Sequence, residues 1–464
     1  MRRPTFSNKL FIAYLAILCW APLPFGSNRP WAFLLLSILI FCLTLALLVQ
    51  AIKHNIAIGA LLKPYRAALI ILFLVPLWVT IQSLPLPAGI VSWLSPNGFE
   101  LWRVSEIDTA WLTLSLEPGM TRQMAMLSWA FFLFFTMTLL LVDSRRRLRQ
   151  LMMTIVACGV FQALYGSVMT LSGLEFGFFI ENNAYLGRAT GTFINRNHLA
   201  GYLEMCLAVG IGLLLVSLNQ NRIQGWRNHL RSLLDTILGP KMRLRLYLAL
   251  MVIALVLTQS RMGNTAFFVS LTVCGLFLLI LQRRRSTGML VLFASLLLVD
   301  FFIVGQWFGF EELVERMENV SVDRESRDEV AQESLVMVED YLVTGTGAGT
   351  YYSSYPQYRS SDVSGFYDHA HNDYVEFLAT FGALGSLPLA ASVLLAMIVA
   401  VRVLIKRHDR LARGAAFAVT MGVVSLLIHS TVDFNLHIPS NALLFVVVLA
   451  MAQLSKALKR TTAR

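Results

Sequence analysis

The chain has 464 residues, of which 56% are hydrophobic and only 14% are charged, and its mean hydropathy is +0.65. Soluble globular domains carry about 25% charged residues, so the composition excludes that class and indicates a membrane protein. The formal net charge of +11 must then reflect either membrane orientation or an acidic partner.

Apolar runs of about 18 to 22 residues recur along the chain, which is the length that an α-helix needs to cross a bilayer. The first run is not followed by a small-residue cleavage site, and a second run comes directly after it. We therefore expect an uncleaved span rather than a signal peptide. The sequence predicts an all-α polytopic protein with about twelve transmembrane helices, at roughly 9–24, 31–50, 66–84, 122–142, 150–172, 198–218, 245–260, 264–282, 288–306, 380–401, 413–430 and 439–455.

The basic residues predict how these spans are oriented, because cytoplasmic segments are enriched in lysine and arginine. If the N-terminus is cytoplasmic, the alternation of the spans places 28 of the 38 basic residues on the cytoplasmic side. Both termini are then predicted to be cytoplasmic. The net charge follows from this topology, so no nucleic-acid partner is needed to explain it.

Two predicted extracytoplasmic loops are long, about 85–121 and about 307–375. In the second, apolar residues at near-helical spacing from Asp328 to Leu342 predict an amphipathic helix that ends before the segment TGTGAGT. No buried strand precedes this segment and no GK[ST] follows it, which favours a turn over a nucleotide-binding loop. We expect spans one to nine in residues 1–306, a helical cap before span ten in 307–375, and the last three spans in 376–464.

Ten basic residues remain on the extracytoplasmic face or at its boundary, and all ten are arginines. Arginine is suited to bidentate recognition of phosphate or carboxylate groups. Lipid head-group anchors and loop salt bridges would account for about half of them. The ten are Arg29, Arg103, Arg122, Arg188, Arg196, Arg261, Arg316, Arg324, Arg327 and Arg359.

A polar group precedes the sixth predicted span, in GRATGTFINRNHLAGYLEM. Arg196 and His198 stand where a helix is predicted to begin, and the unpaired N–H groups of a helix N-terminus attract anions. Helix capping by an asparagine, with an arginine that reaches the head groups, is the alternative interpretation. The candidate substrate-binding residues here are Arg188, Asn195, Arg196, Asn197 and His198.

Two further arginines are candidates. Arg261 lies in TQSRMGNTAF, a short connection between spans seven and eight, and an arginine at the membrane boundary requires a partner. A head-group anchor is the alternative. Arg327 lies at the start of the predicted cap helix in DRESRDE, where composition alone favours a solvated salt bridge.

The segment HSTVDFNLHIPSN connects the last two spans and contains Asp433 and His437. These side chains could orient catalytic groups. Hydrogen bonding between them that fixes the turn is an equally good interpretation.

The segment DHAHNDYVEF contains a predicted capping box, with Asp373 as the N-cap and Glu376 three residues later. A helix that begins at Tyr374 would leave His371 just outside its positive end. There an imidazolium is disfavoured, so we expect a neutral histidine that can accept a proton. A structural histidine is an alternative.

A metal site is a second alternative for this segment, built from Asp368, His369, His371 and Asp373. Histidines two residues apart diverge in both strands and helices, and no HExxH spacing is present. We therefore predict no metal site.

A histidine, several arginines and several amides on one face suit one chemistry in particular. The arginines would stabilise a diphosphate leaving group, and the histidine would deprotonate an attacking sugar hydroxyl. No metal ion would then be required at the diphosphate, because guanidinium groups would replace it. The residues predict a glycosyltransferase that uses a polyprenyl-diphosphate donor on the extracytoplasmic face.

Several motifs support this prediction. His371-Asn372 is followed after nine residues by Gly382-Ala-Leu-Gly385, Arg261 lies in QSRMGN, and Arg327 precedes Gly345 of TGTGAG by eighteen residues. With PLPFGSNRPW, GTFINRNHLAGYLE and HSTVDFNLHIPSNALLF, they make the sequence resemble the bacterial O-antigen ligase and Wzy-type polysaccharide polymerase family. The resemblance extends over most of the chain.

The resemblance implies a GT-C-like membrane architecture and an inverting, metal-independent glycosyl transfer without a cofactor. The expected location is the bacterial inner membrane, with the active site facing the periplasm. The expected partners are an undecaprenyl-diphosphate-linked glycan donor, a glycan or lipid A–core acceptor and membrane lipid. The implied catalytic residues are His371, Arg261 and Arg327, and further candidate substrate-binding residues are His369, Asn372, Asp373, Asp433 and His437.

Several functions remain open at this point. A ligase and a polymerase differ only in the acceptor, and transfer to a protein acceptor is a related possibility. A secondary transporter would also have twelve spans, but the two halves show no internal similarity and polar residues gather at one face rather than at mid-span. A non-catalytic assembly partner would not require the histidine and the arginines.

Overall fold

The computed structural model describes residues 6–105, 110–181, 183–217, 240–281, 322–361, 363 and 367–458. Within these residues the protein is almost entirely helical, and nine helical segments are long and apolar enough to cross a membrane. The prediction of an all-α polytopic membrane protein is therefore confirmed. The nine segments are α2 (Pro30–Lys53), Ile58–Ser83, which contains α3 (Ile58–Leu62) and α4 (Arg66–Ser83), α7 (Pro118–Leu141), α8 (Arg145–Ser172), α9 (Arg196–Ser217), α12 (Arg261–Leu281), α17 (Asp373–Lys406), α18 (Arg410–His429) and α19 (Pro439–Ala457).

The other three predicted spans are not among these nine segments. The span predicted at 9–24 corresponds to α1 (Asn8–Trp20), which has only 13 residues. The span predicted at 245–260 corresponds to α11 (Pro240–Leu257), which is 18 residues long and carries three basic residues near its start. The span predicted at 288–306 lies outside the described residues.

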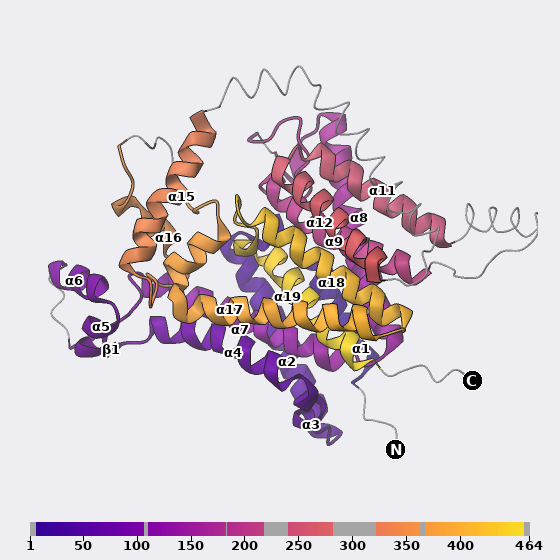
Figure 1. Ribbon diagram of the computed structural model, residues 1–464. Coiled ribbons are helices and arrows are strands. Elements are labelled where there is room, and N and C mark those ends of the chain that lie inside the picture. The colour runs from indigo at the N-terminus through magenta and orange to yellow at the C-terminus, as the bar shows by residue number, and fades with distance from the viewer. Residues whose placement is uncertain are drawn as a thin grey trace, which may run out of the picture.

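The centre of the bundle is formed by α9, α18 and α19, whose residues are mostly buried. Helices α9 and α18 approach closely where Gly212 faces Gly414, because small residues allow the backbones of two membrane helices to come together. Figure 1 shows α2, α4, α7 and α17 on one side of this centre and α8, α11 and α12 on the other.

Among its described residues, the cap predicted in 307–375 contains the α-helices α15 (Val322–Asp340) and α16 (Tyr351–Ser354) and the 3-10 helix η3 (Tyr355–Gln357). The hydroxyl groups of Ser334 and Tyr351 lie 2.7 Å apart, and the rings of Tyr351 and Tyr355 are stacked at 5.2 Å. A helix is thus present where the apolar pattern predicted one, and it begins earlier than that pattern indicated. The predicted apolar face is only partly buried, because Leu335 and Leu342 are exposed. Figure 1 shows both cap helices at one end of the long helices α4, α7 and α17.

A backbone junction fixes the cap to α17. Helix α17 is interrupted at Gly382, whose φ of 63° and ψ of −178° are not helical. The interruption exposes peptide groups that pair with the turn after α15: the Thr346 N–H donates to the Ala379 carbonyl at 2.9 Å, and the Ala383 N–H donates to the Leu342 carbonyl at 2.7 Å. The glycine-rich segment is therefore a docking turn, in agreement with the prediction of a turn.

Side chains from α4 complete this junction. The Gln82 amide donates to the carbonyls of Thr344 and Thr380, at 2.7 and 2.9 Å, and the Trp78 indole N–H donates to the Phe381 carbonyl at 2.7 Å. The carbonyl groups released by the break are thus satisfied by a neighbouring helix, as buried backbone groups require.

The loop predicted at about 85–121 carries short helices and a strand pair at the same end of the molecule as the cap. Trp93 and Trp111 are largely exposed there, and tryptophan is enriched where proteins meet the membrane interface. The elements are β1 (Leu86–Pro87), α5 (Ala88–Leu94), α6 (Pro96–Val104) and β2 (Trp111–Leu112), with β1 and β2 antiparallel. A second antiparallel pair, β3 (Phe176–Gly177) and β4 (Ile180–Glu181), follows α8.

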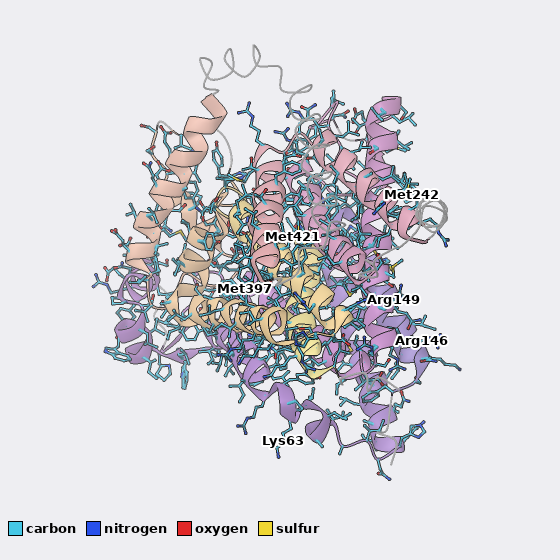
Figure 2. All side chains as sticks on the ribbon, turned by 45° about the vertical axis from the view of Figure 1, so that its right-hand side comes forward. Lys63, Arg146, Arg149, Met242, Met397 and Met421 are labelled. Atoms are coloured by element: carbon cyan, nitrogen blue, oxygen red, sulfur yellow. The ribbon has the colours of Figure 1, made fainter. Side chains whose placement is uncertain are left out.

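Basic side chains occupy the other end of the bundle. Figure 2 shows the labelled Lys63, Arg146 and Arg149 on the part of the molecule away from α15. These three residues belong to segments that the sequence predicts to be cytoplasmic.

Candidate functional site

The start of α17 meets the connection between α18 and α19, and Asp373 is the residue that joins them. Its carboxylate accepts hydrogen bonds from the Ser430 hydroxyl at 2.6 Å and from the Leu436 N–H at 3.2 Å. The other carboxylate oxygen lies 2.8 Å from Nδ1 of His437. Asp373 is 1% exposed, so this end of α17 is firmly attached to the connection.

The predicted capping box is wrong by one residue. The N-cap of α17 is Asn372, whose side-chain oxygen accepts from the N–H groups of Tyr374 and Val375, and the helix begins at Asp373. Asparagine caps a helix as well as aspartate does, which leaves the Asp373 carboxylate available for the connection. In a capping box the Glu376 carboxylate would accept from the N–H of the N-cap residue. Here it accepts from the Ala370 N–H instead, at 2.9 Å.

His371 lies directly before this cap, as predicted. Its φ of 50° places it in the left-handed region, which costs a residue other than glycine about 1 to 3 kcal/mol and persists only where the surroundings enforce it. This backbone directs the imidazole edge-on toward Phe434, at 5.0 Å between ring centroids, and toward Tyr367, at 6.0 Å. Strain of this kind is concentrated at functional sites.

Phe434 packs against three histidines from two parts of the chain. The His369 ring stacks on it at 4.0 Å, while the rings of His371 and His198 meet it edge-on at 5.0 and 4.7 Å. Sequence reasoning did not select Phe434. The structure thus brings the predicted residues of the NRNH, DHAHND and HSTVDFNLH segments together around one aromatic ring.

A chain of alternating imidazole and carboxylate groups runs through this site. His369 Nδ1 lies 2.7 Å from Glu376 Oε1, and His437 Nε2 lies 3.3 Å from the same oxygen. His437 Nδ1 then meets Asp373. Burial by itself lowers the pKa of His369, but the negative charges of Glu376, Asp368 and Asp373 outweigh it and raise this pKa above its ordinary value.

The ligand atoms of His369, Glu376 and His437 all lie within 4.8 Å of one another and could hold a metal ion. This set differs from the metal alternative considered from the sequence, which combined Asp368, His369, His371 and Asp373. Of these three residues, His369 and Glu376 are joined by the 2.7 Å contact between Nδ1 and Oε1, whereas His437 Nε2 lies 3.3 Å from that oxygen without a hydrogen bond.

A second polar network lies deeper, between α9 and α18. Glu204 is fully buried, and its carboxylate lies 2.7 Å from His429 Nδ1 and accepts from the Ser425 hydroxyl at 2.7 Å. Asp433 follows, with its carboxylate 3.7 Å from His429 Nε2 and 3.9 Å from His198 Nε2. Glu204 was missed by sequence reasoning, although an acidic residue inside the apolar run GYLEMCLAV is a signal of function.

The arginines of spans six to eight form a separate group. The loop before α9 packs against the connection between α11 and α12, where the Ala189 N–H donates to the Leu257 carbonyl and Arg196 Nη1 donates to the Gln259 carbonyl, both at 2.9 Å. Arg261 is exposed as the first residue of α12, and Arg188 is half-buried. This packing brings three of the predicted arginines to the same end of α9 and α12.

The remaining predicted residues have simpler roles in the geometry. The Asn195 side chain accepts from the Asn197 N–H at 2.9 Å and so caps α9, which was the alternative interpretation. Arg327 lies in α15, but its side chain is outside the described part of the structure.

Comparison with known proteins agrees with the motifs. Residues 246–390 match the family model described as O-Antigen ligase. The matched residues extend from α11 through α12, α15 and the first part of α17, so they include Arg261, Arg327 and His371. The comparison with curated proteins gives no significant match.

Proposed function

Because residues 246–390 form an O-antigen ligase family domain in a multi-span membrane protein, we propose that the protein is an inverting membrane glycosyltransferase. It moves a glycan from an undecaprenyl-diphosphate carrier to an acceptor hydroxyl, in O-antigen or exopolysaccharide ligation or polymerisation. The observation that carries the proposal is the position of His371, held in a strained backbone at the mouth of α17 within the matched residues.

In this mechanism His371 acts as the general base. It removes the proton from the acceptor hydroxyl as the oxygen attacks the anomeric carbon on the face opposite the diphosphate. Arg188, Arg196 and Arg261 supply positive charge at the end of α9 and α12, and α15 supplies Arg327. Fixed positive charges stabilise the negative charge that develops on the departing diphosphate, so the proposal requires no metal ion.

The connection between α18 and α19 positions these groups. Asp373 fixes His437 and the turn at Ser430, and Phe434 supports the imidazoles of His369 and His371. Positioning contributes substantially to catalysis, because reacting groups must be held within hydrogen-bonding distance of each other. Asn372, next to His371, and His198, which packs on Phe434, are also proposed to contact the donor.

The proposed location is the bacterial inner membrane, with the site facing the periplasm and both termini in the cytoplasm. The basic end of the bundle, with Lys63, Arg146 and Arg149 (Figure 2), would then face the cytoplasm. The cap and the exposed Trp93 and Trp111 would lie at the periplasmic interface. This orientation gives the site access to lipid-linked glycans that have already been translocated.

The direct test uses purified protein in liposomes with an undecaprenyl-diphosphate-linked glycan and an acceptor glycan. Release of undecaprenyl diphosphate and formation of the glycan product are measured for the wild type, His371→Asn and His54→Asn. Asparagine tolerates the left-handed backbone of His371, and His54 is an exposed histidine at the end of α2. We expect transfer by the wild type and by His54→Asn, and none by His371→Asn.

Equal transfer by His371→Asn and the wild type would contradict the role of the base. Absence of transfer by the wild type with every acceptor would contradict the proposed function. The acceptor class is read from a deletion strain: accumulated single repeats indicate a polymerase, and long lipid-linked chains that stay unattached indicate a ligase.

A further inference from the structure

The two ring nitrogens of His437 face two different carboxylates. Nδ1 lies 2.8 Å from Oδ1 of Asp373, whose other oxygen accepts from the Ser430 hydroxyl and the Leu436 N–H. A carboxylate that serves as an acceptor places the proton of a neutral imidazole on Nδ1. Nε2 is buried and forms no hydrogen bond with any described residue, although Glu376 Oε1 lies only 3.3 Å away. A nitrogen lone pair therefore faces a carboxylate oxygen, which is an arrangement that a cation between them stabilises.

Glu376 presents the same oxygen to a second imidazole. Its Oε1 lies 2.7 Å from His369 Nδ1, while Oε2 accepts from the Ala370 N–H at 2.9 Å. The Glu376 side chain is only 3% exposed. One buried carboxylate oxygen is thus shared by two imidazole nitrogens that come from different segments of the chain.

Two imidazoles and one carboxylate are a set of ligands that zinc binds in proteins. The ligand atoms of His369, Glu376 and His437 all lie within 4.8 Å of one another. Ligands of a tetrahedral zinc ion lie about 3.4 Å apart, because each bond is about 2.0 to 2.2 Å long. The separations of 2.7 and 3.3 Å from Glu376 Oε1 are close to this value. The His369 side chain is 21% exposed, so this ring has room for the remaining adjustment.

The contacts behind these ligands are those of a metal site. A histidine that ligates a metal usually donates its other ring N–H to a carboxylate, and a ligating carboxylate is itself hydrogen-bonded. Asp373 accepts from His437 Nδ1 in this way, and the Ala370 N–H donates to the second oxygen of Glu376. Two of the three ligands are therefore already oriented by neighbours that leave the ligand atom available.

Aromatic rings hold the planes of both imidazoles. Phe377 stacks on His437 with 4.5 Å between ring centroids, and Phe434 stacks on His369 at 4.0 Å. Phe434 also packs against His371. The three ligand atoms therefore lie beside the proposed base without including it.

We propose that His369 Nδ1, Glu376 Oε1 and His437 Nε2 form a zinc site, which clamps the loop before α17 and the first turn of α17 to the α18–α19 connection. Zinc forms a coordinate bond to each of the three atoms, and water takes the fourth position. The proton between His369 and Glu376 moves to Nε2 of the same imidazole.

Two nitrogen ligands favour zinc over magnesium and calcium, which prefer oxygen. Only one histidine of the DHAHND segment takes part, so the divergence of residues two apart does not oppose this set. Zinc binding at these side chains is structural and does not depend on the proposed transfer reaction, in which arginines face the diphosphate.

The experiment uses the full-length protein in detergent, freed of any affinity tag and treated with a chelator, with zinc chloride as the probe. Zinc bound per chain is measured by equilibrium dialysis, and Tm by thermal unfolding, for the wild type, His369→Gln, Glu376→Gln and the control His54→Gln. His54 is an exposed histidine at the end of α2. In Glu376→Gln the amide oxygen can still accept from the Ala370 N–H. A parallel series replaces zinc chloride with magnesium chloride.

We expect the wild type to bind about one zinc ion per chain. Its Tm should rise by a few degrees with zinc but not with magnesium, because an ion that binds only the folded state stabilises that state. His369→Gln and Glu376→Gln should weaken zinc binding by at least about 10-fold and should lose the rise in Tm. His54→Gln should behave as the wild type.

Zinc binding and a rise in Tm in His369→Gln equal to those of the wild type would overturn the site, and so would a wild type that binds no zinc. If Glu376→Gln lowers the Tm measured without zinc, His369→Gln decides, because its ring is partly exposed and its replacement leaves the buried carboxylate in place. Neither measurement requires glycan transfer, so a failure of the proposed function and a failure of the zinc site are distinguishable.

Discussion

Replacing Gly382 with alanine should loosen the cap from the membrane bundle and abolish glycan transfer. The φ of 63° and ψ of −178° at this position belong to a region that is essentially restricted to glycine. A Cβ there would lie 2.4 Å from the Gly345 nitrogen and 2.4 Å from the Val343 carbonyl oxygen. Both contacts are with backbone atoms, so no side chain can move aside to relieve them.

The destabilisation by Gly382→Ala can be worked out from the contacts at this junction. Backbone strain in this region costs about 1 to 3 kcal/mol. Four backbone hydrogen bonds join residues 342–347 to residues 379–384, and each contributes on the order of 1 kcal/mol. If residue 382 keeps its conformation, the cost is this strain, and if α17 becomes helical there instead, two of these bonds are lost at about 2 kcal/mol, so the destabilisation is about 1 to 3 kcal/mol in either case.

The assay is thermal unfolding of the purified protein in detergent, together with transfer in liposomes. Gly119→Ala is the matched control, because Gly119 lies at the start of α7 and an added Cβ there meets nothing within 4 Å. We expect Gly382→Ala to lower Tm by several degrees and Gly119→Ala to leave it unchanged. Equal Tm and equal transfer in the two variants would refute the idea that the junction holds the cap.

Three further predictions concern single residues. His371→Gly relieves the left-handed strain, so Tm should stay the same or rise slightly while glycan transfer falls by at least about 10². A fall of Tm together with transfer would contradict the catalytic role. Glu204→Ala leaves the buried His429 ring without its carboxylate and should cost about 3 to 5 kcal/mol, whereas Glu204→Gln should cost less, which thermal unfolding can decide. Burial by itself raises the pKa of Asp409, but the hydrogen bonds from Arg145 and the Ala412 N–H outweigh it and lower this pKa. Its stabilisation should therefore be complete above the unfolded-state pKa and disappear as the pH falls through the folded-state value. Arg145→Ala should reduce this acid dependence of Tm, and an unchanged dependence would contradict it.

The membrane spans were largely predictable because hydrocarbon imposes a strong constraint on sequence. A helix that crosses a bilayer must satisfy its own backbone and present apolar side chains, so nine of the twelve predicted spans appear as long apolar helices. Helix α1 shows the limit of this argument. Its apolar run continues beyond Trp20 in the sequence, but the backbone after it forms turns and a short 3-10 helix at Phe25–Ser27.

The start of α17 was predicted less accurately, for a reason that lies in tertiary structure. Asn372 and Asp373 are adjacent and both can cap a helix. Ser430, Leu436 and His437 decide between them, because they bind the Asp373 carboxylate and leave the cap to Asn372. These partners are about sixty residues away in the chain, so local sequence cannot show the choice.

Glu204 illustrates a different limit. Its position inside an apolar run marks it as unusual, but its partner His429 lies 225 residues away. Only the packing of α9 against α18 brings the two together. The sequence could have identified Glu204 as a candidate but not the network to which it belongs.

The spacing between His371-Asn372 and Gly382 has a physical meaning in this fold. The nine intervening residues, 373–381, form a helical rod of about 13 Å between the site and the junction with the cap. Asp373 and Glu376 point their carboxylates into the site from this rod, while the carbonyls of Ala379 and Thr380 pair with the cap. Both ends are therefore fixed by contacts that depend on the rotation of the helix.

Inserting one alanine between Leu378 and Ala379 should uncouple the two ends. One residue rotates everything before it by about 100° and moves it by about 1.5 Å relative to the junction. Asp373 and Glu376 would then leave His437 and His369, and transfer should be lost although every side chain of the site is still present. An alanine inserted into the exposed turn at residues 54–55, after α2, is the control. If the variant with the insertion after Leu378 transfers glycan as fast as the control, the rotation of this helix relative to the cap does not position the site.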